Sequence, residues 1–203
     1  MTLPAWDKLV QLSDATFKPM ITNARSLFSS SDVLTHFLGN GLDMTNCIST
    51  NSMFNNCSQL IEITGTQDWG FTHLVDATQM FSGCSALERI EGMGNWSMRN
   101  VVSMDNMFAN TNQLRFLDMT HWDLSNLQSA ADYEAINSGS SYGKTLRING
   151  KALKQLYAAQ NLTTDLQGMC SSAEPPITID DRKIYEIDLI YNHITEAEVV
   201  QQE

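Results

Sequence analysis

Basic residues are scarce in this sequence. Lysine and arginine together number 12, against 23 aspartates and glutamates, and the formal net charge is −11. Proteins that bind nucleic acids or anionic membranes use clustered basic side chains, and the basic residues here are not clustered. We therefore expect no nucleic-acid partner.

Long apolar runs are also missing. No stretch approaches the roughly 20 apolar residues of a transmembrane helix, so we expect no membrane insertion. The first residues, MTLPAWDKLVQLSDATF, lack the basic region and apolar run of a signal peptide. With no signal peptide in this chain, the protein works without export, has had its signal removed, or leaves the cell as part of something else.

Cysteines spaced for metal binding are absent. The four cysteines form no CxxC pair, which argues against a zinc site, and we predict no metal. Cys57 and Cys84 each follow a phenylalanine by three residues, in a slot that otherwise holds Ser31 and Thr111. A small, weakly polar slot favours free buried thiols, and a disulfide between neighbouring repeats is the alternative.

Motifs for catalysis and cofactors are weak. The segment 139–143, GSSYG, fits the G-x-S-x-G pattern, but that motif needs a preceding strand and a following helix. Its flanks here indicate a helix and a polar loop, so a loop is the expected structure. The sequence has no phosphate loop or dinucleotide fingerprint, and we predict no cofactor and no catalytic residue. The protein is not expected to be an enzyme.

A repeat dominates what is present. A Leu-Phe or Met-Phe pair recurs every 26 or 27 residues, and apolar columns follow it at fixed offsets. A period in this range indicates stacked repeats, each too small to bury its apolar side alone. The phenylalanine column comprises Phe28, Phe54, Phe81 and Phe108, and a second column comprises Leu42, Trp69, Trp96 and Trp122.

Each repeat contains two local signals. A short alternating segment such as Leu-x-x-Ile predicts a strand, and capping residues before the phenylalanine predict one helical or 3-10 turn. We therefore predict an α/β repeat, a leucine-rich-repeat-like solenoid with a short parallel sheet. A polar column is expected to bond neighbouring backbone, and it comprises Asn46, His73, Asn100 and Asn126.

The repeats resemble a known family. The segments MFNNCSQL, MFSGCSALERI and NWSMRNVVSMDNMF are similar to the BspA-like leucine-rich repeat family, over about residues 17–130. The resemblance implies a solenoid with a parallel sheet on one side. It also implies a non-enzymatic protein of adhesion or protein recognition, since the family is typical of bacterial surfaces and occurs in some phages.

Four regions follow from these patterns. We predict an N-terminal cap helix at 1–16, a repeat solenoid at 17–130, a C-terminal cap at 131–162 and an acidic strand segment at 163–203. The segments TLRI and KALKQLYAAQNL predict a strand and a helix of the cap. The acidic segment either packs on the end of the repeats or reaches a partner as an added strand, and the second is preferred.

Alternation along the predicted strands gives a candidate binding face. Residues beside the inward apolar positions should point outward, and an exposed aromatic such as Phe116 is typical of interface anchors. The outward positions are His36, Leu38, Glu62, Thr64, Arg89, Glu91, Phe116 and Asp118.

The expected function is a non-catalytic protein–protein interaction or structural module. We place it in a larger assembly, such as a phage virion or tail, and the alternative is a bacterial cell-surface adhesin or recognition domain. Its partners would be other assembly subunits or a cell-surface ligand, and its location the virion or the extracellular surface. The acidic C-terminal segment is a further possible contact.

Overall fold

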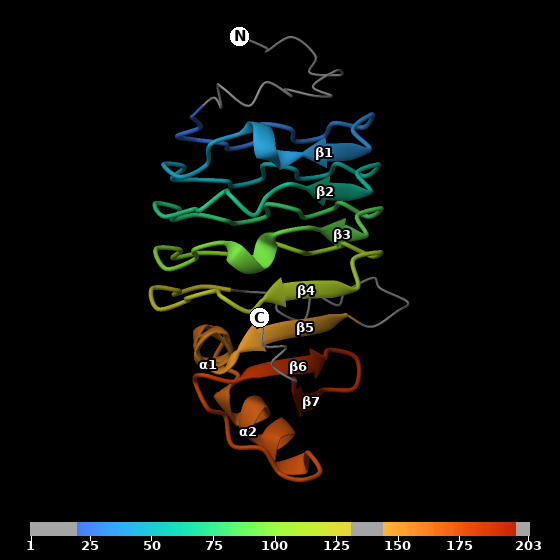
Figure 1. The fold of residues 1–203 in the computed structure, drawn as a ribbon. Coiled ribbons are helices and arrows are strands. Elements are labelled where there is room, and N and C mark those ends of the chain that lie inside the picture. Colours follow the sequence, from blue (N-terminus) through green and yellow to red (C-terminus); the bar gives the residue numbers. More distant parts are fainter. Residues whose placement is uncertain (1–19, 131–143, 198–203) are drawn as a thin grey trace, which may run out of the picture.

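The repeats form a stack of irregular coils with a helical unit at the C-terminal end (Figure 1). The computed structural model describes residues 20–130 and 144–197. Each coil contributes one short strand, and the first three strands form a parallel sheet in chain order. These strands are β1 (His36–Leu38), β2 (Glu62–Thr64) and β3 (Arg89–Ile90).

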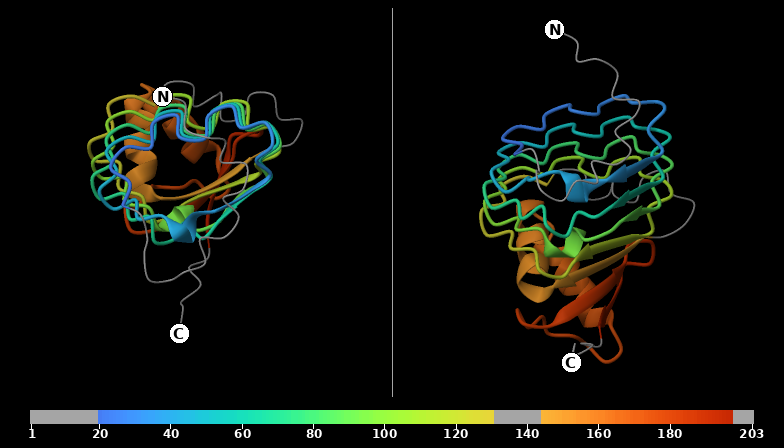
Figure 2. Two further views of the ribbon diagram at one scale, coloured as in Figure 1. Left: turned by 90° about the horizontal axis from the view of Figure 1, so that it is seen from above. Right: turned by 45° about the horizontal axis from the view of Figure 1, so that its top comes forward.

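A second, mixed sheet follows in the order β4-β5-β6-β7. Its first two strands are parallel, and the last two are antiparallel to their neighbours. Two helices lie on this unit, between β5 and β6 in the chain (Figure 2). The bounds are β4 (Phe116–Met119), β5 (Thr145–Asn149), α1 (Gly150–Ala159), α2 (Thr163–Ser172), β6 (Ile184–Asp188) and β7 (His193–Glu196).

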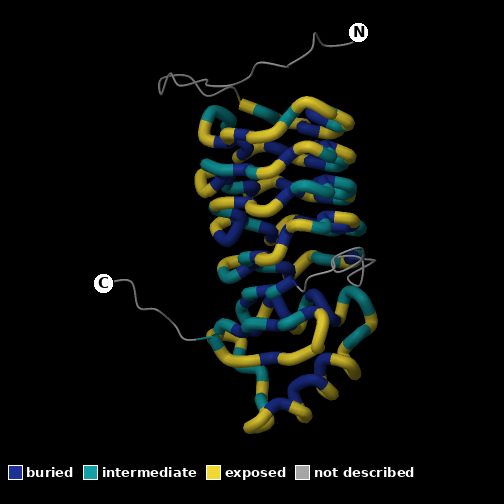
Figure 3. The backbone as a smooth tube through the Cα atoms, turned by 90° about the vertical axis from the view of Figure 1, so that its right-hand side faces the viewer, coloured by how far each residue is buried: buried dark blue, intermediate teal, exposed yellow. Residues whose placement is uncertain are grey.

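Equivalent aromatic side chains stack from coil to coil, as the repeat predicts. The rings of Phe28, Phe54, Phe81 and Phe108 lie 5.2, 5.7 and 5.6 Å apart and are within 15° of parallel. Trp69, Trp96 and Trp122 form a second stack, with spacings of 5.8 and 6.2 Å. Buried stretches therefore alternate with exposed ones along every coil (Figure 3).

The tryptophan column also provides hydrogen-bond donors for buried backbone carbonyls. Each indole N–H donates to a carbonyl of the preceding coil: Trp69 to Gly39 at 2.8 Å, Trp96 to Thr66 at 3.1 Å, and Trp122 to Met93 at 2.7 Å. A buried carbonyl without a hydrogen-bond partner costs free energy. These bonds therefore hold each coil in a defined position on the preceding coil.

The polar column behaves largely as predicted. The side-chain amides of Asn100 and Asn126 donate to the carbonyls of Thr72 and Arg99 in the preceding coil, at 2.7 and 2.9 Å. A ring nitrogen of His73 lies 3.2 Å from the carbonyl of Thr45. Asn46 differs, because its amide contacts the sulfur of Met20.

The four cysteines are buried thiols without a disulfide. Cys57 and Cys84 occupy equivalent positions, and their Sγ atoms donate to the carbonyls of Phe28 and Phe54 at 3.0 Å. In the next coil the hydroxyl of Thr111 donates to the carbonyl of Phe108 at 2.7 Å. The slot therefore needs a small donor, which explains why Cys and Thr both fill it.

The fold class predicted from the sequence is wrong. The structure is a small α/β protein with two separate sheets and, within the described residues, two α-helices, both after residue 149. It is not a leucine-rich-repeat solenoid with one continuous sheet, because the parallel ladder stops at β3 and β4 pairs with β5 instead. The cap helix predicted at 1–16 lies outside the described residues.

The helical turn predicted before each phenylalanine is also wrong. The backbone there makes consecutive tight turns, in which the N–H groups of Met53, Asn55 and Cys57 each donate to the carbonyl three residues earlier. Ser52 and Asn56 have φ of 57° and 59°, and Gln79 and Gly83 repeat these left-handed positions one coil later. A positive φ at the third residue of a turn closes a type II turn and stops a helix.

The C-terminal segment adds to the chain's own sheet. β6 pairs with β5 over five residues, from Thr145 with Asp188 to Asn149 with Ile184. The preferred interpretation of an added strand for a partner is therefore wrong for residues 184–188, since their main-chain bonds are made within the chain. The first ten residues of this segment, TTDLQGMCSS, form the short helix α2, as their sequence predicts.

Candidate functional site

The outward face of the first sheet contains the predicted residues in rows. His36, Glu62 and Arg89 lie in register on adjacent strands, and Leu38 lies beside Thr64. The residues between them, Phe37, Ile63 and Ile90, are buried. Glu91 is exposed just after β3, where its N–H donates to the carbonyl of Ile63 at 2.8 Å.

Phe116 and Asp118 belong to the second sheet and do not continue these rows by strand pairing. Phe116 lies in register with Thr145, and Asp118 with Arg147. The strands nonetheless follow one another along one side of the stack (Figure 1). The predicted face is therefore divided between two sheets.

Charged residues on this face are mostly paired with one another. Arg89 forms an ion pair with Glu62, and the Nε atom of Arg147 lies 3.8 Å from a carboxylate oxygen of Glu186. Surface ion pairs of this kind contribute little net stability, roughly 0–1 kcal/mol. They do lower the free charge of the face.

Asp118 has a structural role that alternation could not reveal. Its Oδ1 atom accepts hydrogen bonds from the backbone N–H and the hydroxyl of Thr120, at 3.0 and 2.8 Å. The carboxylate also lies against Gly94, where an added Cβ would come within 2.7 Å of it. Asp118 therefore stabilises the turn after β4, and its carboxylate already accepts hydrogen bonds from Thr120.

Two apolar side chains remain available on the outward face. Leu38 is 45% exposed and Phe116 is 46% exposed, at opposite ends of the run of strands from β1 to β4. Both are held on strands, so little conformational entropy would be lost when a partner covers them. The face is thus a polar surface with an apolar anchor at each end.

The sequence prediction missed residues on the second sheet. Arg147 and Thr145 extend the two outward rows, followed by Glu186 and Asp188 on β6. The alternation in TLRIN and KIYEID was the signal, but it did not show that these strands pair next to Phe116. The burial pattern of β5 and β6 alternates as that signal indicates.

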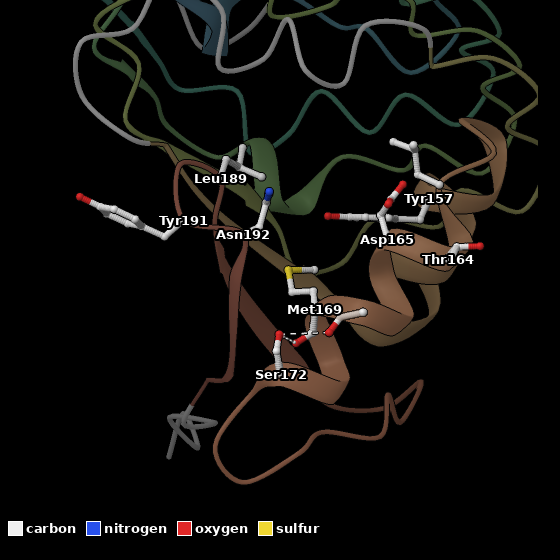
Figure 4. A pocket seen from close by; sticks show the side chains of 10 residues that line it. Tyr157, Thr164, Asp165, Met169, Ser172, Leu189, Tyr191 and Asn192 are labelled. Carbon is white, nitrogen blue, oxygen red and sulfur yellow. Dashed lines mark hydrogen bonds between the residues drawn. The ribbon is translucent and has the colours of Figure 1, made fainter.

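A groove at the C-terminal end was also missed. It lies between α2 and the turn that joins β6 to β7, with a volume of about 660 Å³ (Figure 4). Leu189, Tyr191 and Asn192 form the hairpin side, while Asp165 and Met169 lie on the helix. The groove joins segments that are distant in the sequence, which local patterns cannot bring together.

One residue on the helix side of the groove offers a direct test of the local structure. Gly168 is exposed in the interior of α2, and an added Cβ would meet nothing within 4 Å. Alanine favours helix over glycine by about 1 kcal/mol. Gly168→Ala should therefore raise the free energy of unfolding by roughly 0.5–1 kcal/mol. Urea denaturation checks this, and a loss of stability would show that the space beside Gly168 is filled.

Other kinds of site do not form in the described residues. Within residues 20–130 and 144–197, no three His, Cys, Asp or Glu side chains gather as metal ligands. The same part of the chain has no helix long and apolar enough to cross a membrane. The G-x-S-x-G segment at 139–143 lies outside the described residues.

The fold and face together define a repeat protein with an exposed, partly apolar sheet surface. A family model described as "Mycoplasma protein of unknown function, DUF285" matches residues 20–139, more than half of the chain, and the chain belongs to this family. Searches of the curated proteins and of the solved structures found no match.

Proposed function

We propose that the chain is a non-catalytic protein-binding module whose outward sheet face contacts the partner. The observation that carries this proposal is the half-exposure of Leu38 and Phe116 on rigid strands. Aromatic side chains of this kind anchor protein interfaces, where a few residues supply most of the binding energy. We also propose that the Met-Phe repeats are related to the BspA-like repeats that they resemble in sequence.

Two settings suit such a module. In the first, the chain is a fixed subunit of a larger assembly, such as a phage virion or tail, as its acidic charge and small polar face suggest. In the second, it is a recognition domain at a bacterial cell surface.

Site-specific crosslinking distinguishes the two settings. A photoreactive phenylalanine analogue at position 116 should crosslink to one protein in material from the source. A structural protein of purified particles, crosslinked at stoichiometric level, supports the assembly. A cell-surface protein supports the adhesin. The analogue at Gln128, which is exposed elsewhere on the stack, is the matched control. Equal crosslinking at both positions would contradict the proposed face.

Phe116→Ala should weaken binding of the crosslinked partner by about tenfold or more, because the half-exposed ring supplies apolar contact area. Ile48→Ala is the matched control, since Ile48 is 56% exposed but lies outside both sheets. Surface plasmon resonance with the purified partner measures both. Unchanged affinity for the Phe116 variant would remove the face from consideration.

A further inference from the structure

We infer that Cys57 and Cys84 form a disulfide when the chain folds in an oxidising environment, and that this disulfide joins two neighbouring coils of the stack. The oxidant is a low-molecular-weight disulfide such as oxidised glutathione. Both side chains are thiols in the structure, so the inference concerns a modification of this pair. Oxidising conditions prevail outside cells and not in the cytosol. The inference depends on packing inside the stack and is independent of the proposed binding face.

The two cysteines hold equivalent positions, one repeat apart, where the main chains of two coils lie close together. Just before Cys57 and Cys84, the N–H of Asn56 donates to the carbonyl of Ser82 at 2.8 Å, which holds the coils in register. An added Cβ on Gly83 would lie 3.3 Å from the Cα atom of Asn56. Hydrogen-bonded neighbouring chains lie about 4.8 Å apart, within the roughly 4.4–6.8 Å that separates the Cα atoms of a disulfide. The backbone therefore suits a bridge at this position.

The two thiols also contact each other. The Sγ atom of Cys84 donates to the carbonyl of Phe54 at 3.0 Å, and the same carbonyl accepts the backbone N–H of Cys57 at 3.0 Å. The sulfur of Cys84 therefore lies beside the main chain of Cys57. The hydrogen bond between the two thiols lowers the pKa of Cys57 and raises the pKa of Cys84. Cys57 is thus the thiol of the pair that ionises first and acts as the nucleophile.

Oxidation would leave no buried carbonyl of this slot without a partner. The thiol of Cys57 donates to the carbonyl of Phe28, which also accepts the backbone N–H of Ser31 at 3.1 Å. The carbonyl of Phe54 keeps the backbone N–H of Cys57 in the same way. Both carbonyls therefore retain a donor after the thiol hydrogens are lost, and the penalty for an unpaired buried acceptor does not arise.

The reaction consists of two thiol–disulfide exchanges. The thiolate of Cys57 attacks one sulfur of oxidised glutathione, forms a mixed disulfide and releases one glutathione thiolate. The thiolate of Cys84 then attacks the Cys57 sulfur of the mixed disulfide, forms the protein disulfide and releases the second glutathione. The cysteines lose two protons and two electrons, and glutathione accepts both electrons. Because neither side chain has exposed surface in the folded stack, the first exchange takes place while the coils are open, and folding then brings Cys84 to the mixed disulfide.

The test is refolding of the full chain from urea in a mixture of oxidised and reduced glutathione, followed by alkylation of free thiols and mass spectrometry. We expect two of the four cysteines to escape alkylation, in a peptide that links Cys57 to Cys84. The same mixture in concentrated urea is the control, since loop closure in an unfolded chain favours the closer pair, Cys47 with Cys57. A preference for Cys47 with Cys57 after refolding, or no disulfide at all, would overturn the inference.

Variants and denaturation identify the pair and its effect. Cys84→Ser should prevent the disulfide while it keeps a small donor in the slot, and Cys47→Ser should leave the disulfide unchanged. The oxidised protein should unfold at a urea concentration roughly 1 M higher than the reduced protein, because the disulfide closes a loop of one repeat in the unfolded chain. The Cys84→Ser variant should show no such difference. An oxidised protein that unfolds at a lower urea concentration than the reduced one would contradict the geometry on which the inference rests.

Discussion

Phe81→Ala should lower the free energy of unfolding by about 3–5 kcal/mol, the usual cost of removing a buried phenyl ring. The ring is fully buried and stacked between Phe54 and Phe108, at 5.7 and 5.6 Å, with Trp96 at 6.3 Å. Truncation removes contacts to the coil above, the coil below and the adjacent column, so a cavity remains that neither neighbour can fill alone. Denaturant-induced unfolding measures the loss.

The matched control is another phenylalanine, Phe116, which is 46% exposed on β4. Phe116→Ala should change stability by less than about 1 kcal/mol, because its ring is half in water in the folded state. A near-neutral result for Phe81→Ala, or equal losses for the two variants, would mean that the phenylalanine column is not the core of the stack.

Asn149→Ala should cost about 2–4 kcal/mol, the second largest effect that we expect. Asn149 is the N-cap of α1, and its side-chain oxygen accepts from the N–H of Ala152 at 2.8 Å. The amide nitrogen of the same side chain donates to the carbonyls of Thr120 and Trp122, at 3.1 and 2.8 Å. One side chain therefore joins the last coil of the stack to the first helix.

Asn149→Ser separates the two roles. Serine keeps the helix cap but lacks the amide N–H groups, so about half of the loss should remain. Denaturant unfolding gives the free energies, and hydrogen exchange at Ala152 reports on the cap. If the Asn149→Ser variant were as stable as the natural protein, the two carbonyl bonds would contribute nothing, and α1 would be held by its cap alone.

The side-chain columns of the repeat could be predicted from the sequence, because burial depends on spacing and size. Phe28 to Phe108 and Trp69 to Trp122 stack as that spacing indicates. The strand TLRI and the helix that begins at Gly150 also lie where the patterns placed them.

The backbone path between the columns could not be predicted in the same way. Ser52 and Gln79 adopt positive φ angles although neither residue type favours them, so the first left-handed position of these turns carries no clear local signal. The second position does carry one, because Asn56 and Gly83 are of types that favour a positive φ. Gly92 follows β3 with a φ of 85°, and an added Cβ there would lie 2.5 Å from the backbone nitrogen of Gln67 in the preceding coil. That close approach is a tertiary contact, which local sequence patterns do not reveal.

The candidate sites, too, could be predicted from the sequence only in part. Alternation separated the buried positions of the first sheet from their more exposed neighbours, but it could not show that Asp118 accepts hydrogen bonds from Thr120. The groove forms where α2 and the β6–β7 turn lie close together, and the pattern of a single segment does not predict that contact.

The constant stacking of the coils has a consequence for the distance between the two apolar anchors. Leu38 belongs to the first strand of the stack and Phe116 to the fourth, so two intervening strands separate them. Paired strands lie about 4.8 Å apart, so three such steps span roughly 15 Å, a minimum because β3 and β4 are not paired. The number of repeats thus sets the distance between Leu38 and Phe116. One more coil between them would increase that distance by a single strand spacing and would leave both side chains unchanged.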